Sequence, residues 1–182
     1  MLSNLTYKVV AYGHVDRLNS DEVIDWALDM LDLNFVAPSL YVLASIEKGS
    51  AFYEVQPYLE EAISELGLQR KTDDDALVSY SMFHVNEIAN QKNVRANIKI
   101  LCDICIAEDY ANEIYDFYSL NFAWMDYDHD PNYPFNHYWE GATAKNIERI
   151  CIEQSELWLE QYKKQYEQIS IQGEWKTLRF SL

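Results

Sequence analysis

The sequence predicts an all-α fold, an irregular bundle of seven to eight helices that ends in a short extended C-terminal tail. Apolar residues recur at helical spacing along most of the 182 residues. Glycine and proline are scarce, with 5 and 4 copies, and most of them lie where a periodic segment begins or ends. Helix pairs arranged as in an α-solenoid are an alternative, although no repeat of fixed period is present. The length predicts a single helical domain over 1–182.

Three helices are predicted in the first part of the chain. Segment 21–33 follows Ser20, a residue type that caps helix N-termini, and two acids fall in its first turn, where the helix dipole favours negative charge. The next two helices each have a proline near the start and a glycine just past the end, as helix punctuation predicts. These brackets are Pro38 with Gly49 and Pro57 with Gly67.

Four more helices are predicted in the rest of the chain. A segment capped by Thr72 or Asp73 repeats apolar residues to Ile88, and polar residues 90–93 interrupt it. The helix after this break, Ala96–Ala107, is apolar on most faces and is therefore expected to be central. The last two helices and the tail complete the prediction. They are Tyr110–Met125, a long helix capped by Thr143 and reaching Ile169, and an extended tail containing Trp175, Leu178, Phe180 and Leu182.

Charge excludes several kinds of partner. The net charge is −16, and a field of this sign repels nucleic-acid phosphates and anionic lipid but attracts basic proteins. The longest uncharged run, Leu33–Ile46, has 14 residues, too few to span a bilayer. We therefore expect a basic protein partner, no nucleic acid and no membrane. Three cysteines and no visible targeting segment favour a cytoplasmic location.

The most informative segment lies between Lys99 and Lys145. Its forty-five residues contain no lysine or arginine, but nine carboxylates and eleven aromatic rings. Residues 126–137 contain two prolines and many turn formers, which predicts a loop, and residues 127–139 hold more rings than a small core can bury. Negative charge combined with amphipathic rings suits recognition of a cationic partner. The predicted partner-binding residues are Asp126, Asp128, Asp130, Tyr133, Tyr138 and Trp139.

The aromatic residues of this segment also allow a purely structural interpretation. Tyr115, Tyr118 and Phe122 recur at helical spacing, which is equally typical of a helix face in the core. Trp139 could likewise anchor the loop to the core rather than contact a partner. The two interpretations predict different effects of mutation, on stability or on affinity.

Catalytic and metal-binding motifs are weak. Asp126 to His137 resembles a calcium loop in its alternating acids, but proline stands where glycine is needed and His137 where a bidentate glutamate is needed. Cys102 and Cys105 have C-x-x-C spacing, but they lie mid-helix without a second pair, so buried reduced thiols are expected. His84 lies on an apolar helix face and is expected to be a core histidine. The sequence indicates no cofactor, no metal and no catalytic residue.

Three stretches, DFYSLNFAW, HYWEGATAKNIERI and SLYVLASIEKG, resemble small acidic helical proteins of bacteria. The resemblance covers about 21–66 and 115–160 and contains no catalytic signature. Some proteins of this type are immunity partners of secreted toxins, so the resemblance implies a binding protein. The leading prediction is thus a non-enzymatic acidic protein that docks or neutralises a basic protein. The alternatives are an enzyme of unrecognised type with carboxylates in a helical cleft, and a small-ligand-binding regulatory module.

Overall fold

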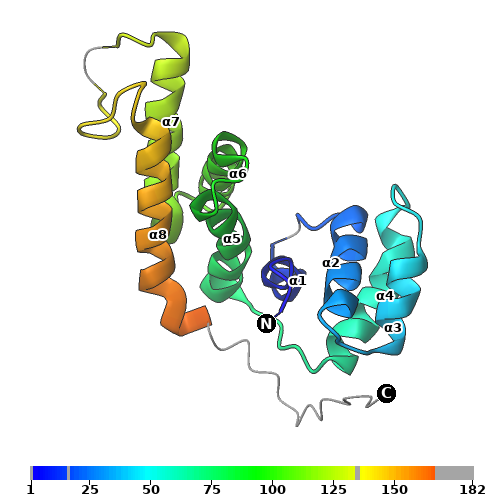
Figure 1. Cartoon of the computed structure of the whole chain (residues 1–182). Coiled ribbons are helices and arrows are strands. Elements are labelled where there is room, and N and C mark those ends of the chain that lie inside the picture. The colour runs from blue at the N-terminus through cyan, green and yellow to red at the C-terminus, as the bar shows by residue number, and fades with distance from the viewer. Residues whose placement is uncertain (1, 16, 134–135, 167–182) are drawn as a thin grey trace. The chain divides into compact units, whose positions relative to one another are not determined.

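The computed structural model describes residues 2–15, 17–133 and 136–166, and all secondary structure within these ranges is helical (Figure 1). This confirms the all-α prediction, and more than half of the chain lies in helices. The predicted tail lies outside the described residues. The helices are α1 (Thr6–Ala11), α2 (Ser20–Asp32), α3 (Pro38–Ser45), α4 (Phe52–Glu65), α5 (Asp73–Ala89), α6 (Val94–Ala107), α7 (Tyr115–His129) and α8 (Ile147–Tyr166), with a 3₁₀ turn at Asn112–Ile114.

The chain forms two compact units, and the boundary between them falls within α5. Unit 1 contains the described residues up to Leu77, and unit 2 runs from Val78 to Tyr166. A single domain over 1–182 stays a prediction, and each unit is described by itself below.

In unit 1, α2, α3 and α4 pack against one another around an apolar core. Trp26 of α2 is completely buried, and its indole Nε1 donates a hydrogen bond of 3.0 Å to Thr6 Oγ1 of α1. This short helix α1 was not predicted, because six residues are too few to show a helical period. Its Lys8 is buried and forms an ion pair with Glu22 of α2.

The N-terminus of α2 is capped by Asn19 rather than by the predicted Ser20. The Glu22 backbone N–H donates to Asn19 Oδ1 at 3.0 Å, and the Asn19 N–H donates to Glu22 Oε2 at 3.1 Å. This reciprocal pair is a capping box, which satisfies two backbone N–H groups that the helix itself leaves unpaired. Glu22 therefore serves both the cap of α2 and the ion pair with Lys8.

The predicted bounds of the second and third helices, each taken from a proline and a glycine, were only partly right. Pro38 is in the first turn of α3, as predicted, but α3 ends at Ser45 rather than near Gly49. Pro57 lies inside α4, which begins five residues earlier at Phe52, so the prediction that Pro57 opens this helix is wrong. The neighbouring helix supplies the missing cap of α3: Ser39 N–H and Oγ donate to Glu65 and Glu61 of α4, at 3.0 and 3.1 Å.

In unit 2, α6 packs against both α7 and α8, and α7 and α8 run side by side, joined by the loop at one end of the pair (Figure 1). The helix predicted at Ala96–Ala107 is therefore present as α6 and contacts both of the other long helices that lie wholly within unit 2. Its inward side chains are buried. They include Ile98, Leu101, Cys102, Ile104 and Cys105.

The predicted break at residues 90–93 is confirmed, with α5 ending at Ala89 and α6 beginning at Val94. Gln91 and Asn93 adopt left-handed φ angles of 58° and 47°, which turn the chain sharply. Asn97 fastens this turn, because its Nδ2 donates to the carbonyls of Lys92 and Asn93 at 3.0 and 3.3 Å.

The last two helices differ from their predicted bounds. α7 begins at Tyr115, after the 3₁₀ turn, and continues to His129, so Asp126 and Asp128 lie in its last turns rather than in a loop. The helix can continue through these aspartates because the first proline, Pro131, comes only after the end of α7. α8 begins at Ile147, four residues after the predicted cap Thr143. The Thr143 carbonyl nevertheless accepts the Ile147 N–H at 3.0 Å.

Candidate functional site

Helix α7 carries core residues of unit 2 on one face and partly or largely exposed aromatic side chains on another. Phe117, Leu120 and Ala123 of α7 are completely buried, and Tyr127 follows them on the inner side. Tyr115, Tyr118 and Phe122 are spaced by three and four residues and share a second face, because such spacings place side chains on one side of a helix.

The three rings on this face and two rings from outside α7 form one connected set of ring contacts. We call them the aromatic ladder, and the set is Tyr110, Tyr115, Tyr118, Phe122 and Tyr138. The ring of Tyr118 lies 5.5 Å from Tyr110, 5.2 Å from Tyr115 and 4.8 Å from Phe122, between centroids. Phe122 is stacked on Tyr138, with centroids 5.3 Å apart. These separations are typical of stabilising aromatic pairs.

The ladder presents its outer rings to solvent. Tyr110, Tyr115 and Tyr138 are 48%, 43% and 44% exposed, while Tyr118 and Phe122 are partly buried between them. Partial burial raises the pKa of Tyr118, and the nearby hydroxyls of Tyr110, Tyr115 and Tyr138 raise it further. The hydroxyl of Tyr118 therefore stays protonated at physiological pH.

The segment after α7 is tied back to the helix by side-chain hydrogen bonds. Asn136 Nδ2 donates to the carbonyl of Ala123 at 3.0 Å, and Asn136 Oδ1 accepts the N–H groups of Tyr138 and Trp139 at 3.0 and 2.9 Å. The Tyr127 hydroxyl donates to the Ala142 carbonyl at 2.6 Å. These bonds hold Tyr138 against Phe122 and so complete the ladder.

The six predicted site residues have different surroundings. Tyr138 belongs to the ladder, and Asp126 is on α7 one turn beyond Phe122, partly buried. Asp130 follows the helix and accepts the Asn132 N–H on Oδ1 at 2.9 Å. Tyr133 is 38% exposed, and Trp139 is half-buried.

The sixth predicted residue, Asp128, forms an ion pair with Arg95 of the same unit. Arg95 of α6 donates to Asp128 Oδ2 from Nη2 at 3.0 Å and from Nε at 3.2 Å. Its Nη1 donates to Asn121 Oδ1 at 2.6 Å, and its guanidinium carbon lies 5.3 Å from the centre of the Trp124 ring. This arginine joins α6 to α7 and neutralises the charge of Asp128, which leaves less of that charge for a partner.

Sequence reasoning missed four of the five ladder residues. For Tyr115, Tyr118 and Phe122 the sequence left a core role open on their helical spacing. In the structure Tyr115 is largely exposed, whereas Phe117 and Leu120 of the same turns are fully buried. Tyr110 was taken as the start of the helix. One sequence pattern could have identified them. Aromatic residues occur on two faces of α7, and a small unit can bury only one of these faces, so the other must be exposed.

The thiols and the histidine that were considered as chemical groups are buried. Cys102, Cys105 and Cys151 are free and buried, as predicted for the first two. Burial raises the pKa of Cys105 to about 11 and that of Cys151 to about 12, which keeps both thiols protonated. His84 is buried as expected, with Nδ1 2.8 Å from Asn97 Oδ1. Since the amide of Asn97 donates to carbonyls, this Oδ1 accepts and Nδ1 of His84 carries the proton.

Comparisons with known families, curated proteins and solved structures found no match to this chain. Among the described residues, no three side chains of the His, Cys, Asp or Glu type gather as a metal site would require. None of the described helices is long and apolar enough to cross a bilayer.

Proposed function

We propose that this chain is a non-enzymatic acidic binding protein that docks a basic protein partner, in the way an immunity protein docks its toxin. The observation that carries the proposal is the aromatic ladder, a continuous row of partly exposed rings within a segment of forty-five residues that has no base. Tyrosine is enriched at protein-binding hot spots because it supplies large apolar area with a polar tip.

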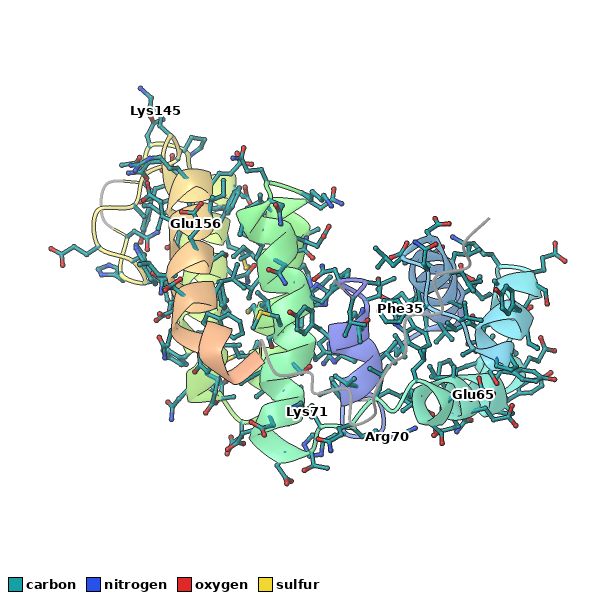
Figure 2. The ribbon with its side chains drawn as sticks, turned by 60° about the horizontal axis from the view of Figure 1, so that its bottom comes forward. Phe35, Glu65, Arg70, Lys71, Lys145 and Glu156 are labelled. Carbon is teal, nitrogen blue, oxygen red and sulfur yellow. The ribbon has the colours of Figure 1, made fainter. Side chains whose placement is uncertain are left out.

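The charges around the ladder support this choice of partner. Glu108 and Asp109 are exposed beside Tyr110, Asp126 follows Phe122 on α7, and Asp130 ends the helix. Lysines are absent until Lys145, which projects outward from the loop before α8 (Figure 2). Carboxylates that surround exposed rings accelerate encounter with a basic partner and disfavour an acidic one.

The site also has a fixed geometry. Asn136 and Tyr127 hold the loop against α7 through the hydrogen bonds described above, so little further ordering is needed when a partner is bound. A preorganised surface loses less conformational entropy on association, and more of its contact energy then appears as affinity.

The proposal is tested by capture from extracts of the source cells on the immobilised chain. The experiment compares the wild-type chain with Tyr115→Ser/Tyr138→Ser and with a control, Tyr41→Ser/Tyr53→Ser, whose tyrosines are 55% and 72% exposed on α3 and α4. We expect a protein with net positive charge to be retained by the wild type and the control, and released by the ladder variant. An acidic partner, no partner, or equal retention by all three chains would contradict the proposal.

If the partner is a toxin, a second readout is direct. Co-expression of the wild-type chain should restore growth of cells that express the captured partner, and the ladder variant should not. Equal protection by both chains would show that the ladder is not the binding surface.

A further inference from the structure

We infer that the aromatic ladder recognises arginine side chains of its partner, with guanidinium groups stacked on the exposed tyrosine rings and paired with the neighbouring carboxylates. This inference rests on the proposed function and names the chemistry by which the same surface selects its partner. It commits to an arginine-rich segment of another protein as the occupant.

The first support is an arrangement of the same kind within unit 2. The guanidinium of Arg95 lies over the ring of Trp124 and donates to Asp128 and Asn121, all three on α7. Helix α7 thus already binds one arginine through a ring, a carboxylate and an amide. The ladder offers rings and carboxylates on another face of the same helix, where no arginine or lysine occurs nearby in the sequence.

The second support is the spacing of the exposed rings. Tyr115 and Phe122 are seven residues apart on α7, which corresponds to about 10 Å along the helix axis. Tyr138 extends the row beyond Phe122, and Tyr110 contacts it at Tyr118. Two arginines spaced by seven residues on a partner helix have the same separation as Tyr115 and Phe122, the ring on which Tyr138 is stacked.

The third support is the distribution of charge. Asp109 precedes Tyr110 in the chain, and Asp126 lies one helical turn beyond Phe122 on α7, so both rings have a carboxylate close to them in the sequence. The nearest base before this segment, Lys99, already pairs with Asp103 of the same helix at 2.7 Å. A guanidinium can lie flat on a ring while its edge donates to a carboxylate.

Arginine fits this surface better than lysine does. The guanidinium is planar and weakly hydrated, so it stacks on tyrosine with little loss of solvation, whereas the compact ammonium of lysine retains its water more strongly. Cation–π contacts accordingly involve arginine more often than lysine. Carboxylates attract both residues and favour arginine only through bidentate pairing, so the ladder is the feature that adds stacking to this preference.

The test uses two helical peptides of equal length and charge, one with arginines and one with lysines at positions i, i+3 and i+7. Affinity for the full chain is measured by isothermal titration calorimetry at physiological salt. We expect the arginine peptide to bind about tenfold more tightly than the lysine peptide, a difference of about 1.4 kcal/mol. Binding should shift the aromatic NMR signals of Tyr110, Tyr115 and Tyr138.

Three variants separate stacking from general attraction. Tyr115→Ser/Tyr138→Ser should remove the preference for arginine, and Tyr115→Leu, which keeps apolar area but has no ring, should reduce it. The control Tyr41→Ser/Tyr53→Ser should leave it unchanged. Circular dichroism of each variant checks that the helices are intact, and the Tyr115→Leu result stands if the double variant does not fold.

Equal affinity for both peptides, no binding of either below about 1 mM, or an equal loss in the control would each overturn the inference. These results differ from a failure of the proposed function. A basic partner captured through the ladder with no preference for arginine would keep the docking proposal and refute arginine recognition alone.

Discussion

Arg95 Nη2 lies 3.0 Å from Asp128 Oδ2, so a base on α6 neutralises an acid on α7 that the sequence assigned to partner binding. The same guanidinium donates to the buried Asn121. This arginine therefore connects the two helices most closely packed in unit 2, and it limits the surface charge of α7 at one position.

Substitution of Arg95 should reduce the stability of the fold more than substitution of Asp128. Arg95→Ala should lower the free energy of unfolding by about 1–3 kcal/mol, because the buried amide of Asn121 loses its charged donor. Asp128→Asn should cost less than about 1 kcal/mol, because exposed ion pairs contribute little. Urea denaturation of both single variants and the double variant measures the coupling. Equal costs for the two single substitutions would contradict the role given to Asn121.

The position of the loop after α7 should depend on the hydroxyl group of Tyr127. Tyr127→Phe removes the hydrogen bond to the Ala142 carbonyl and should lower stability by about 1–2 kcal/mol, since a buried carbonyl loses its donor. Hydrogen exchange at residues 136–142 should accelerate in this variant. The exposed Tyr133→Phe is the control and should change neither quantity. Unchanged exchange in Tyr127→Phe would show that this bond does not hold the loop.

The ion pair between the buried Lys8 and Glu22 should contribute more to the stability of unit 1 than the exposed pair between Lys48 and Asp25. Glu22→Gln retains a capping side chain for α2 but removes the negative charge beside the buried Lys8, and should cost about 1–3 kcal/mol. Asp25→Asn, which breaks a pair with the exposed Lys48, should have a much smaller effect, because water screens exposed charges. Thermal or urea melts of the two variants give the comparison. A larger loss in Asp25→Asn would argue against it.

The buried thiols should make the fold sensitive to alkali. The pKa of Cys151 is raised from 9.0 to about 12 and that of Cys105 to about 11, both chiefly by burial. A raised pKa in the folded state means that the unfolded chain releases its protons first as pH increases. The stability from these neutral thiols is complete below pH 9.0 and is lost as pH rises through 11 to 12.

Urea denaturation between about pH 8 and pH 10.5 measures this loss, and the slope with pH should be smaller in Cys151→Ala. A thiol reagent should react slowly with the native protein and quickly in denaturant. Stability that does not change over this range, or rapid labelling of all three thiols in the native state, would contradict the burial of these groups.

Most of the helices could be predicted from the sequence, and the errors have physical causes. The long helices have clear apolar periods, and the left-handed turn at Gln91 and Asn93 coincides with a run of polar residues. The start of α4 was misplaced because a proline is common in the first turn of a helix. Pro57 instead lies inside α4, at an exposed position. The cap of α2 was misplaced by one residue because Asn19 and Ser20 are both good caps.

The candidate site was predicted in its region but not in its composition. The acids and rings of the segment without lysine or arginine drew attention to the region of the proposed site, yet the prediction concentrated on the loop. Which face of α7 is exposed depends on the packing of α6 and α8, which no local pattern specifies. The pairing of Asp128 with Arg95 was equally out of reach, because the two residues are far apart in the chain.

The central claim is that the acidic aromatic surface of unit 2 docks a basic protein, and the kinetics of that association test it most directly. Association and dissociation rate constants of the captured partner would be measured across salt concentrations, for the wild type, Asp126→Asn/Asp130→Asn and Tyr115→Ser/Tyr138→Ser. The account predicts that salt and the aspartate substitutions slow association, while the ladder substitutions accelerate dissociation at least tenfold, about 1.4 kcal/mol or more. An association rate independent of salt, with dissociation unchanged in the ladder variant, would contradict it.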